Sequence, residues 1–159
     1  MPTATIPMQA DSASPPPGRA LRILYADDMP ELRELLTEVL MREGHQIETV
    51  GDGDEALARL QQARSGFDLL ITDHHMPGVN GLELVRQTRQ LQYPGKIVVI
   101  SSELSETVLE QYREFAVDAI LAKPIFPLTL RTVLEQLFAE GHPQSTREQS
   151  ATPFLSAHG

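Results

Sequence analysis

Acidic, hydroxyl and basic side chains follow short apolar segments of this sequence, in an order that favours phosphoryl chemistry. Asp27 and Asp28 follow LRILYA, Asp73 follows FDLLIT, Ser101 closes KIVVIS, and Lys123 follows AILA. A carboxylate can attack phosphorus as a nucleophile and form an aspartyl phosphate. Phosphoryl transfer depends mostly on positioning and on neutralising the equatorial oxygens, which a metal ion, an ammonium group and a hydroxyl can do together.

Three of these side chains also form a candidate metal site. Carboxylates that crowd together repel one another and raise one another's pKa. A hard cation with oxygen ligands relieves this repulsion, and Mg²⁺ favours a few carboxylates with water and phosphate oxygens. We therefore expect Asp27, Asp28 and Asp73 to hold Mg²⁺. Lys123 adds a compact charge that can pair with Asp73 at rest and with a phosphoryl oxygen afterwards.

The elements that must position these residues alternate between strand and helix patterns. Strands are expected at 21–26, 46–50, 67–72, 96–101 and 119–122, and helices at 30–43, 54–64, 82–91, after a cap at Ser105, and at 128–139. Continuous apolar strands imply burial on both faces and hence a parallel sheet. In such sheets the binding crevice lies beyond the carboxyl ends of the strands, where the candidate residues stand.

The helix expected at 30–43 illustrates the pattern on which these assignments rest. Its apolar residues recur at helical spacing and predict one buried face. They are Leu32, Leu35, Leu36, Val39 and Leu40.

Length and composition indicate one acidic domain. The 159 residues divide into a Pro-rich leader (1–19), a domain (20–140) and a polar tail (141–159). With 22 acidic and 13 basic residues, the formal net charge of -9 argues against nonspecific nucleic-acid binding. The chain has no cysteine and no apolar run long enough for a membrane span, so we expect a cytoplasmic protein with no membrane partner.

Four motifs together resemble the receiver domains of bacterial two-component response regulators. They are Asp27-Asp28, TDHHMPGVNG around Asp73, VISSE with Ser101, and LAKP with Lys123. The resemblance covers about residues 20–140, and the chain looks like a stand-alone receiver of the chemotaxis-regulator type or like a receiver cut from a longer protein. It implies a flavodoxin-like α/β fold, which is a doubly wound parallel sheet of five strands in the order 2-1-3-4-5 with five helices.

The resemblance also implies a role for each acidic residue. Asp73 would be the phosphorylation site, and Asp28 would be a direct Mg²⁺ ligand. Asp27 would act on the metal largely through water. The backbone carbonyl of His75, two residues after Asp73, would complete the ligands that the protein provides.

Further roles follow for the residues after the fourth and fifth strands. Ser101 would be the hydroxyl that turns inward upon phosphorylation, with Ser102 and Glu103 at the pocket rim. Lys123 would contact the phosphoryl group, and the Lys123–Pro124 peptide bond is expected to be cis. The donor would be a histidine kinase or a histidine phosphotransfer protein. The response would be an altered contact with a downstream protein, through the surface of the fourth and fifth helices and the fifth strand.

Two residues depart from the pattern of that family. Ile120 stands where many receivers have an aromatic residue that belongs to their switch. Ala116 stands where a Gly often ends the fourth helix, and a left-handed backbone there would cost about 1 kcal/mol relative to Gly.

Three alternatives to this interpretation are open, two of them functions and one a different metal site. One is a docking receiver that no longer accepts phosphate, which Ile120 alone favours. A second is an aspartate-nucleophile phosphatase, but such enzymes usually have a carboxylate two residues after the nucleophile, where this chain has His75. The third is a transition-metal site at His74 and His75, which is disfavoured because adjacent side chains point in different directions. We therefore expect a signalling domain and not an enzyme.

Overall fold

The computed structural model describes residues 20–63 and 66–139, so the expected leader and tail lie outside the described residues. Strands and helices alternate through the described part of the chain. The elements are β1 (Arg22–Ala26), α2 (Pro30–Arg42), β2 (Gln46–Val50), α3 (Gly53–Gln62), β3 (Leu69–Asp73), α4 (Gly81–Gln90), β4 (Lys96–Ser101), α5 (Glu106–Glu114), β5 (Ala119–Ala122) and α6 (Pro127–Leu137).

The strands form one parallel sheet in the order β2-β1-β3-β4-β5. This confirms the predicted flavodoxin-like topology. The chain adds β2 on one side of β1 and then adds β3, β4 and β5 on the other side. The order therefore reverses between β1 and β3, and the crevice at such a reversal is where doubly wound sheets bind ligands.

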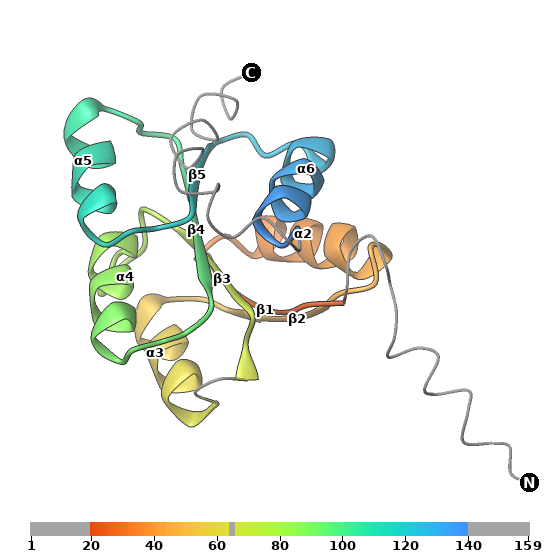
Figure 1. Cartoon of the computed structure of the whole chain (residues 1–159), viewed down its shortest axis with the longest axis horizontal. Helices are drawn as coiled ribbons and strands as arrows, with labels where there is room; N and C mark the ends of the chain where they lie inside the picture. The colour runs from red at the N-terminus through yellow and green to blue at the C-terminus, as the bar shows by residue number, and fades with distance from the viewer. Residues whose placement is uncertain (1–19, 64–65, 140–159) are drawn as a thin grey trace, which may run out of the picture.

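Helices cover both faces of the sheet, α2 and α6 on one face and α3, α4 and α5 on the other (Figure 1). Alternate residues of each strand point to opposite faces. In β3, Leu69 and Ile71 pack with the cluster beneath α2 and α6, whereas Leu70 packs with the cluster beneath α3, α4 and α5. Burial on both faces explains why the inner strands β1, β3 and β4 are mostly apolar in sequence, whereas the edge strand β2 is only partly buried.

Side-chain caps fix the start of the three helices on one face of the sheet, α3, α4 and α5. Asp52 and Asn80 each accept a hydrogen bond of 2.9 Å, from the backbone N–H groups of Glu55 and Glu83 respectively. The predicted cap at Ser105 is confirmed, because its hydroxyl accepts from a backbone N–H in the first turn of α5 at 3.3 Å. Each cap satisfies an N–H group that has no partner within the helix.

Two local expectations have different outcomes. Leu36 and Leu40 of α2 are buried, but Leu35 is 43% exposed, so its assignment to the buried face was wrong. Leu32 and Val39 are partly buried, so the buried face of α2 is centred on Leu36 and Leu40. Ala116, by contrast, has a φ of 53°, which is the left-handed conformation considered for it.

Within the part of the chain that the structure describes, no helix has the length and apolar character needed to cross a membrane.

Candidate functional site

Three carboxylates meet at the carboxyl ends of β1 and β3. Asp27, Asp28 and Asp73 each offer an oxygen, and these oxygens lie within 4.8 Å of one another. Asp27 is fully buried and Asp73 is 3% exposed, whereas Asp28 is exposed to solvent. The sheet thus brings together all three carboxylates that were predicted to form a metal site, and it leaves one of them open to solvent.

Lys123 supplies the positive charge at this cluster from the end of β5. Its ammonium nitrogen lies 3.0 Å from Oδ1 of Asp73 and 4.0 Å from Oδ2 of Asp27. The Lys123–Pro124 peptide bond is cis. Because the lysine side chain is 21% exposed, it can also reach a group that enters the crevice from solvent.

The electrostatic environment of Asp73 disfavours its charged form. Burial is the main cause of a raised pKa for this carboxyl group, and the neighbouring Asp27 charge adds to it. Lys123 and the backbone N–H of His74, 2.9 Å from Oδ1 of Asp73, act in the opposite direction. Three crowded carboxyl groups suit a divalent cation with oxygen ligands, which relieves their mutual repulsion, so these residues fit Mg²⁺.

Asp27 is held by its neighbours along the chain. The Tyr25 hydroxyl donates to its Oδ2 at 2.5 Å, and the backbone N–H of Met29 donates to its Oδ1 at 2.9 Å. The Arg33 guanidinium donates to its backbone carbonyl at 2.6 Å. Tyr25 was not among the site residues predicted from the sequence. A signal was available, because residues two apart in a strand point to the same face.

Ser101 is buried, and its hydroxyl is engaged with the backbone of Glu103. The hydroxyl accepts from the N–H of Glu103 at 2.8 Å and donates to its carbonyl at 2.9 Å. Ser102 and Glu103 are exposed beside it, at the start of the loop from β4 to α5. In this structure the Ser101 hydroxyl therefore bonds to its own loop.

The two histidines after Asp73 lie in contact with each other. Their rings meet edge to face with centroids 4.6 Å apart. His74 is buried, and its Nδ1 lies 2.6 Å from the hydroxyl of Tyr112 in α5. Burial lowers the pKa of His74. His75 is exposed, and its Nε2 lies 3.2 Å from Oε1 of Glu103.

The start of α4 packs closely beneath this segment. A Cβ atom added to Gly81 would overlap the backbone carbonyl oxygen of Asp73 and crowd the Tyr112 hydroxyl. Glycine is therefore required here by close approach. Ile120, which replaces the usual aromatic residue, is 1% exposed and belongs to the core cluster beneath α3, α4 and α5. Its side chain is part of the core and does not extend into solvent.

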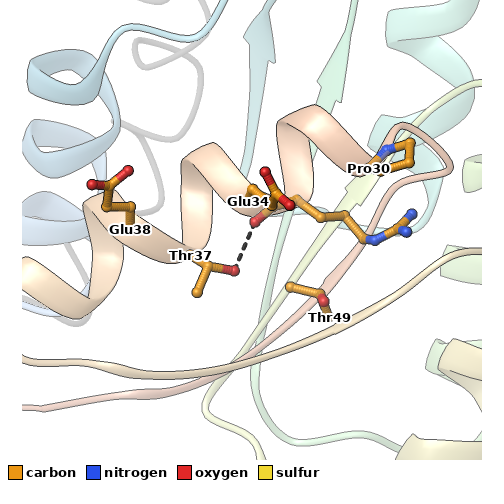
Figure 2. A pocket seen from close by; sticks show the side chains of 6 residues that line it. Pro30, Glu34, Thr37, Glu38 and Thr49 are labelled. Atoms are coloured by element: carbon orange, nitrogen blue, oxygen red, sulfur yellow. Dashed lines mark hydrogen bonds between the residues drawn. The ribbon is translucent and has the colours of Figure 1, made fainter.

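A surface pocket lies on α2 and β2, outside the carboxylate cluster (Figure 2). In the figure, the Thr37 hydroxyl donates to the backbone carbonyl of Arg33 at 2.7 Å. The lining has polar and charged groups of both signs but none of the residues predicted to do chemistry. It consists of Pro30, Arg33, Glu34, Thr37, Glu38 and Thr49.

Known proteins are similar to this chain in sequence and in fold. The chain is 33% identical over 139 residues to the sensory/regulatory protein RpfC of Xanthomonas campestris, a match that covers 85% of this chain and 18% of that protein. It is 35% identical over 104 residues to the response regulator receiver protein Anae109_2439 of Anaeromyxobacter, a match that covers 65% of this chain and 43% of the relative. The chain therefore spans less than half the length of these relatives.

A solved structure agrees in fold as well as in sequence. The chemotaxis protein CheY4 of Vibrio cholerae superposes with a TM-score of 0.69 at 32% identity, over 75% of this chain and 99% of that protein. The family model for the response regulator receiver domain matches residues 23–135, which span every strand of the sheet except the first residue of β1. The chain therefore belongs to the response regulator receiver domain family.

Proposed function

We propose that this domain accepts a phosphoryl group on Asp73, in a Mg²⁺-dependent reaction with a histidine kinase or a histidine phosphotransfer protein. Receiver domains act with histidine kinases in two-component signalling and are not conventional enzymes. We assign residues 20–140 to the receiver domain, since the described elements run from Arg22 to Leu137. The observation that carries the proposal is the cluster of Asp27, Asp28 and Asp73 with the Lys123 ammonium 3.0 Å from Asp73.

The contacts of Asp73 indicate which oxygen reacts. Lys123 and the His74 amide both contact Oδ1, so we assign nucleophilic attack to Oδ2. The attack forms an O–P bond while the N–P bond of a phosphohistidine donor breaks. The departing imidazole keeps the electron pair of that bond and takes a proton from solvent. Lys123 then neutralises a phosphoryl oxygen, which is the main task in such a transfer.

The divalent ion would be held by Asp27, Asp28 and Asp73, with the backbone carbonyl of His75 as a further oxygen ligand. Bound Mg²⁺ would neutralise charge on the phosphoryl oxygens and offset the repulsion among the carboxylates. Tyr25 would keep Asp27 oriented toward the ion. The solvent-exposed Asp28 would be the carboxylate that first meets an entering cation.

Ser101 is proposed to be the switch residue. A phosphoryl group on Asp73 would offer its hydroxyl a charged acceptor, and a hydrogen bond to a charged group is stronger than one between neutral groups. Turning inward would break both bonds from Ser101 to Glu103 and release the loop before α5. The resulting shift in population of the α5–β5–α6 surface would change its contact with a protein partner. Because Ile120 is an aliphatic core residue, this response would not depend on a rotating ring.

The test is incubation with Mg²⁺ and acetyl phosphate, followed by intact-mass spectrometry, with Asp73→Asn as the matched control. We expect the wild type to gain one phosphoryl group and the variant to gain none. The proposal fails if the wild type gains none under conditions that preserve acyl phosphates and also fails to bind beryllofluoride. That outcome would favour the docking receiver. Steady turnover of added phosphomonoesters would instead favour the phosphatase.

A further inference from the structure

We propose that His74, His75 and Glu103 form a second metal site, which binds a transition-metal ion such as Zn²⁺ and is separate from the carboxylate cluster. Each residue offers one ligand atom, and these three atoms lie within 4.8 Å of one another. His75 and Glu103 already approach to 3.2 Å. Although adjacent side chains usually diverge, the loop after β3 brings the two imidazole rings to a centroid distance of 4.6 Å.

The ligand set distinguishes this site from the one at Asp73. Imidazole nitrogen suits Zn²⁺, Cu²⁺ and Ni²⁺, whereas Mg²⁺ prefers oxygen ligands. Two histidines and one glutamate match the ligands of zinc sites that have three protein ligands, in which water or another molecule takes the fourth position. The side chains of His75 and Glu103 are 65% and 49% exposed, so an ion can enter from solvent and keep such an open position.

Tyr112 gives the site the outer support that ligating histidines usually have. A metal-bound histidine commonly has its other ring nitrogen held by a hydrogen-bond partner, which fixes the tautomer and the orientation of the ring. The Tyr112 hydroxyl lies 2.6 Å from Nδ1 of the buried His74. With Nδ1 protonated and donating to this hydroxyl, Nε2 is the nitrogen that we assign to the metal.

The site joins the loop after β3 to the loop after β4, and its link to signalling rests on the proposed function. His74 follows Asp73 directly, and Glu103 is held in place by its two hydrogen bonds with Ser101. A metal ion bound by His74, His75 and Glu103 would stabilise the arrangement in which Ser101 bonds to its own loop. Metal binding and phosphorylation would therefore oppose each other, and linkage makes this opposition reciprocal.

The first experiment measures Zn²⁺ affinity by competition with a chromophoric chelator, in excess Mg²⁺ so that the carboxylate cluster is occupied. We expect His75→Ala and Glu103→Gln each to weaken Zn²⁺ binding by more than about tenfold, since loss of an outer-shell partner alone costs roughly 10–100-fold. Both side chains are exposed, so both variants should fold. The control is the double variant His142→Ala, His158→Ala, which removes the histidines near the C-terminus and should bind as the wild type does. Unchanged Zn²⁺ affinity in both single variants, or loss of Zn²⁺ binding in the control variant, would contradict the proposed site.

The second experiment tests the link to signalling through the initial rate of phosphorylation by acetyl phosphate. Zn²⁺ should slow the wild type several-fold and should leave Glu103→Gln unaffected. Equal slowing of both proteins would place the inhibitory ion at the carboxylate cluster and overturn the link. If neither protein gains a phosphoryl group without Zn²⁺, the proposed function fails, whereas the metal site is still decided by the titration.

Discussion

The hydroxyl of Tyr25 donates a hydrogen bond of 2.5 Å to Oδ2 of Asp27, and both side chains are almost completely buried. They stand two residues apart at the end of β1 and therefore share one face of the sheet. A buried carboxylate without such a donor would carry a large desolvation cost. Tyr25 thus satisfies one oxygen of the buried Asp27 carboxyl group and fixes its orientation beneath the crevice.

Tyr25→Phe should weaken Mg²⁺ binding by about tenfold, because a partner that orients a metal ligand contributes on this scale. Calorimetric titration with Mg²⁺ measures the effect. Tyr93→Phe is the matched control, since its hydroxyl is also buried but donates to the carbonyl of Phe67 at 3.1 Å, outside the carboxylate cluster. Equal Mg²⁺ affinities for the two variants would contradict the role given to Tyr25.

Asp73→Asn should stabilise the metal-free domain at neutral pH. Burial and the Asp27 charge raise the pKa of Asp73, so the ionised carboxylate is less favourable in the folded state than in the unfolded state. Removing the charge should raise the free energy of unfolding by about 1 kcal/mol, the usual scale of single substitutions. Urea denaturation with and without Mg²⁺ tests this. Saturating Mg²⁺ should stabilise the wild type more than the variant, and a less stable metal-free variant would contradict the prediction.

His45 should make the domain less stable in mild acid. Burial lowers the pKa of His45, and its Nδ1 accepts from the backbone N–H of Leu21 at 3.0 Å. Between the lowered pKa and the ordinary value, the unfolded chain binds more protons, so stability falls as pH falls through this range.

The measurement compares urea denaturation of the wild type and His45→Gln at about pH 7.5 and pH 5.5, on either side of the ordinary histidine pKa. The wild type should lose about 1 kcal/mol more than the variant, because protonation removes the acceptor of one hydrogen bond. Parallel pH profiles for the two proteins would exclude this role for His45.

Ala116→Gly should stabilise the domain by about 1 kcal/mol. Ala116 is exposed and has a φ of 53°, where a Cβ atom is unfavourable and glycine is not. Ala58→Gly is the control, because Ala58 is equally exposed but lies within α3, where glycine should cost about 1 kcal/mol. Thermal denaturation of both variants should therefore give shifts of opposite sign.

The sequence was most informative about the strands and the topology of the sheet. The bounds of β2, β4 and β5 agree with the predicted ranges. For β4 and β5 the signal was a run of mostly apolar residues that are buried in the parallel sheet, whereas β2 is a partly buried edge strand. The observed ends of several helices differ from the predicted ends by one or two residues. The helix expected at 54–64, for example, begins at Gly53, because Asp52 caps it, and ends at Gln62.

The carboxylates and the lysine of the candidate site could be predicted from the sequence, but the hydrogen bonds that support the site could not. Asp27, Asp28, Asp73 and Lys123 were found because each stands at or just after the end of a strand, and the topology of the sheet then brings them together. The contact between His74 and Tyr112 joins residues 38 positions apart. It depends on how α5 packs beside α4 and the loop after β3, which no local pattern records. A left-handed residue at Gln92, with a φ of 62°, was likewise not anticipated.

The positions of the tyrosines give the molecule an optical property of its own. The chain has three tyrosines and no tryptophan, so no stronger fluorophore masks their emission. All three are buried, and two of them bond to Asp27 or to His74. A carboxylate or imidazole that accepts a proton from an excited phenol quenches its fluorescence. Tyrosine emission should therefore brighten or dim as ions and phosphoryl groups alter these two contacts, which would allow the domain to be followed in real time without any attached dye.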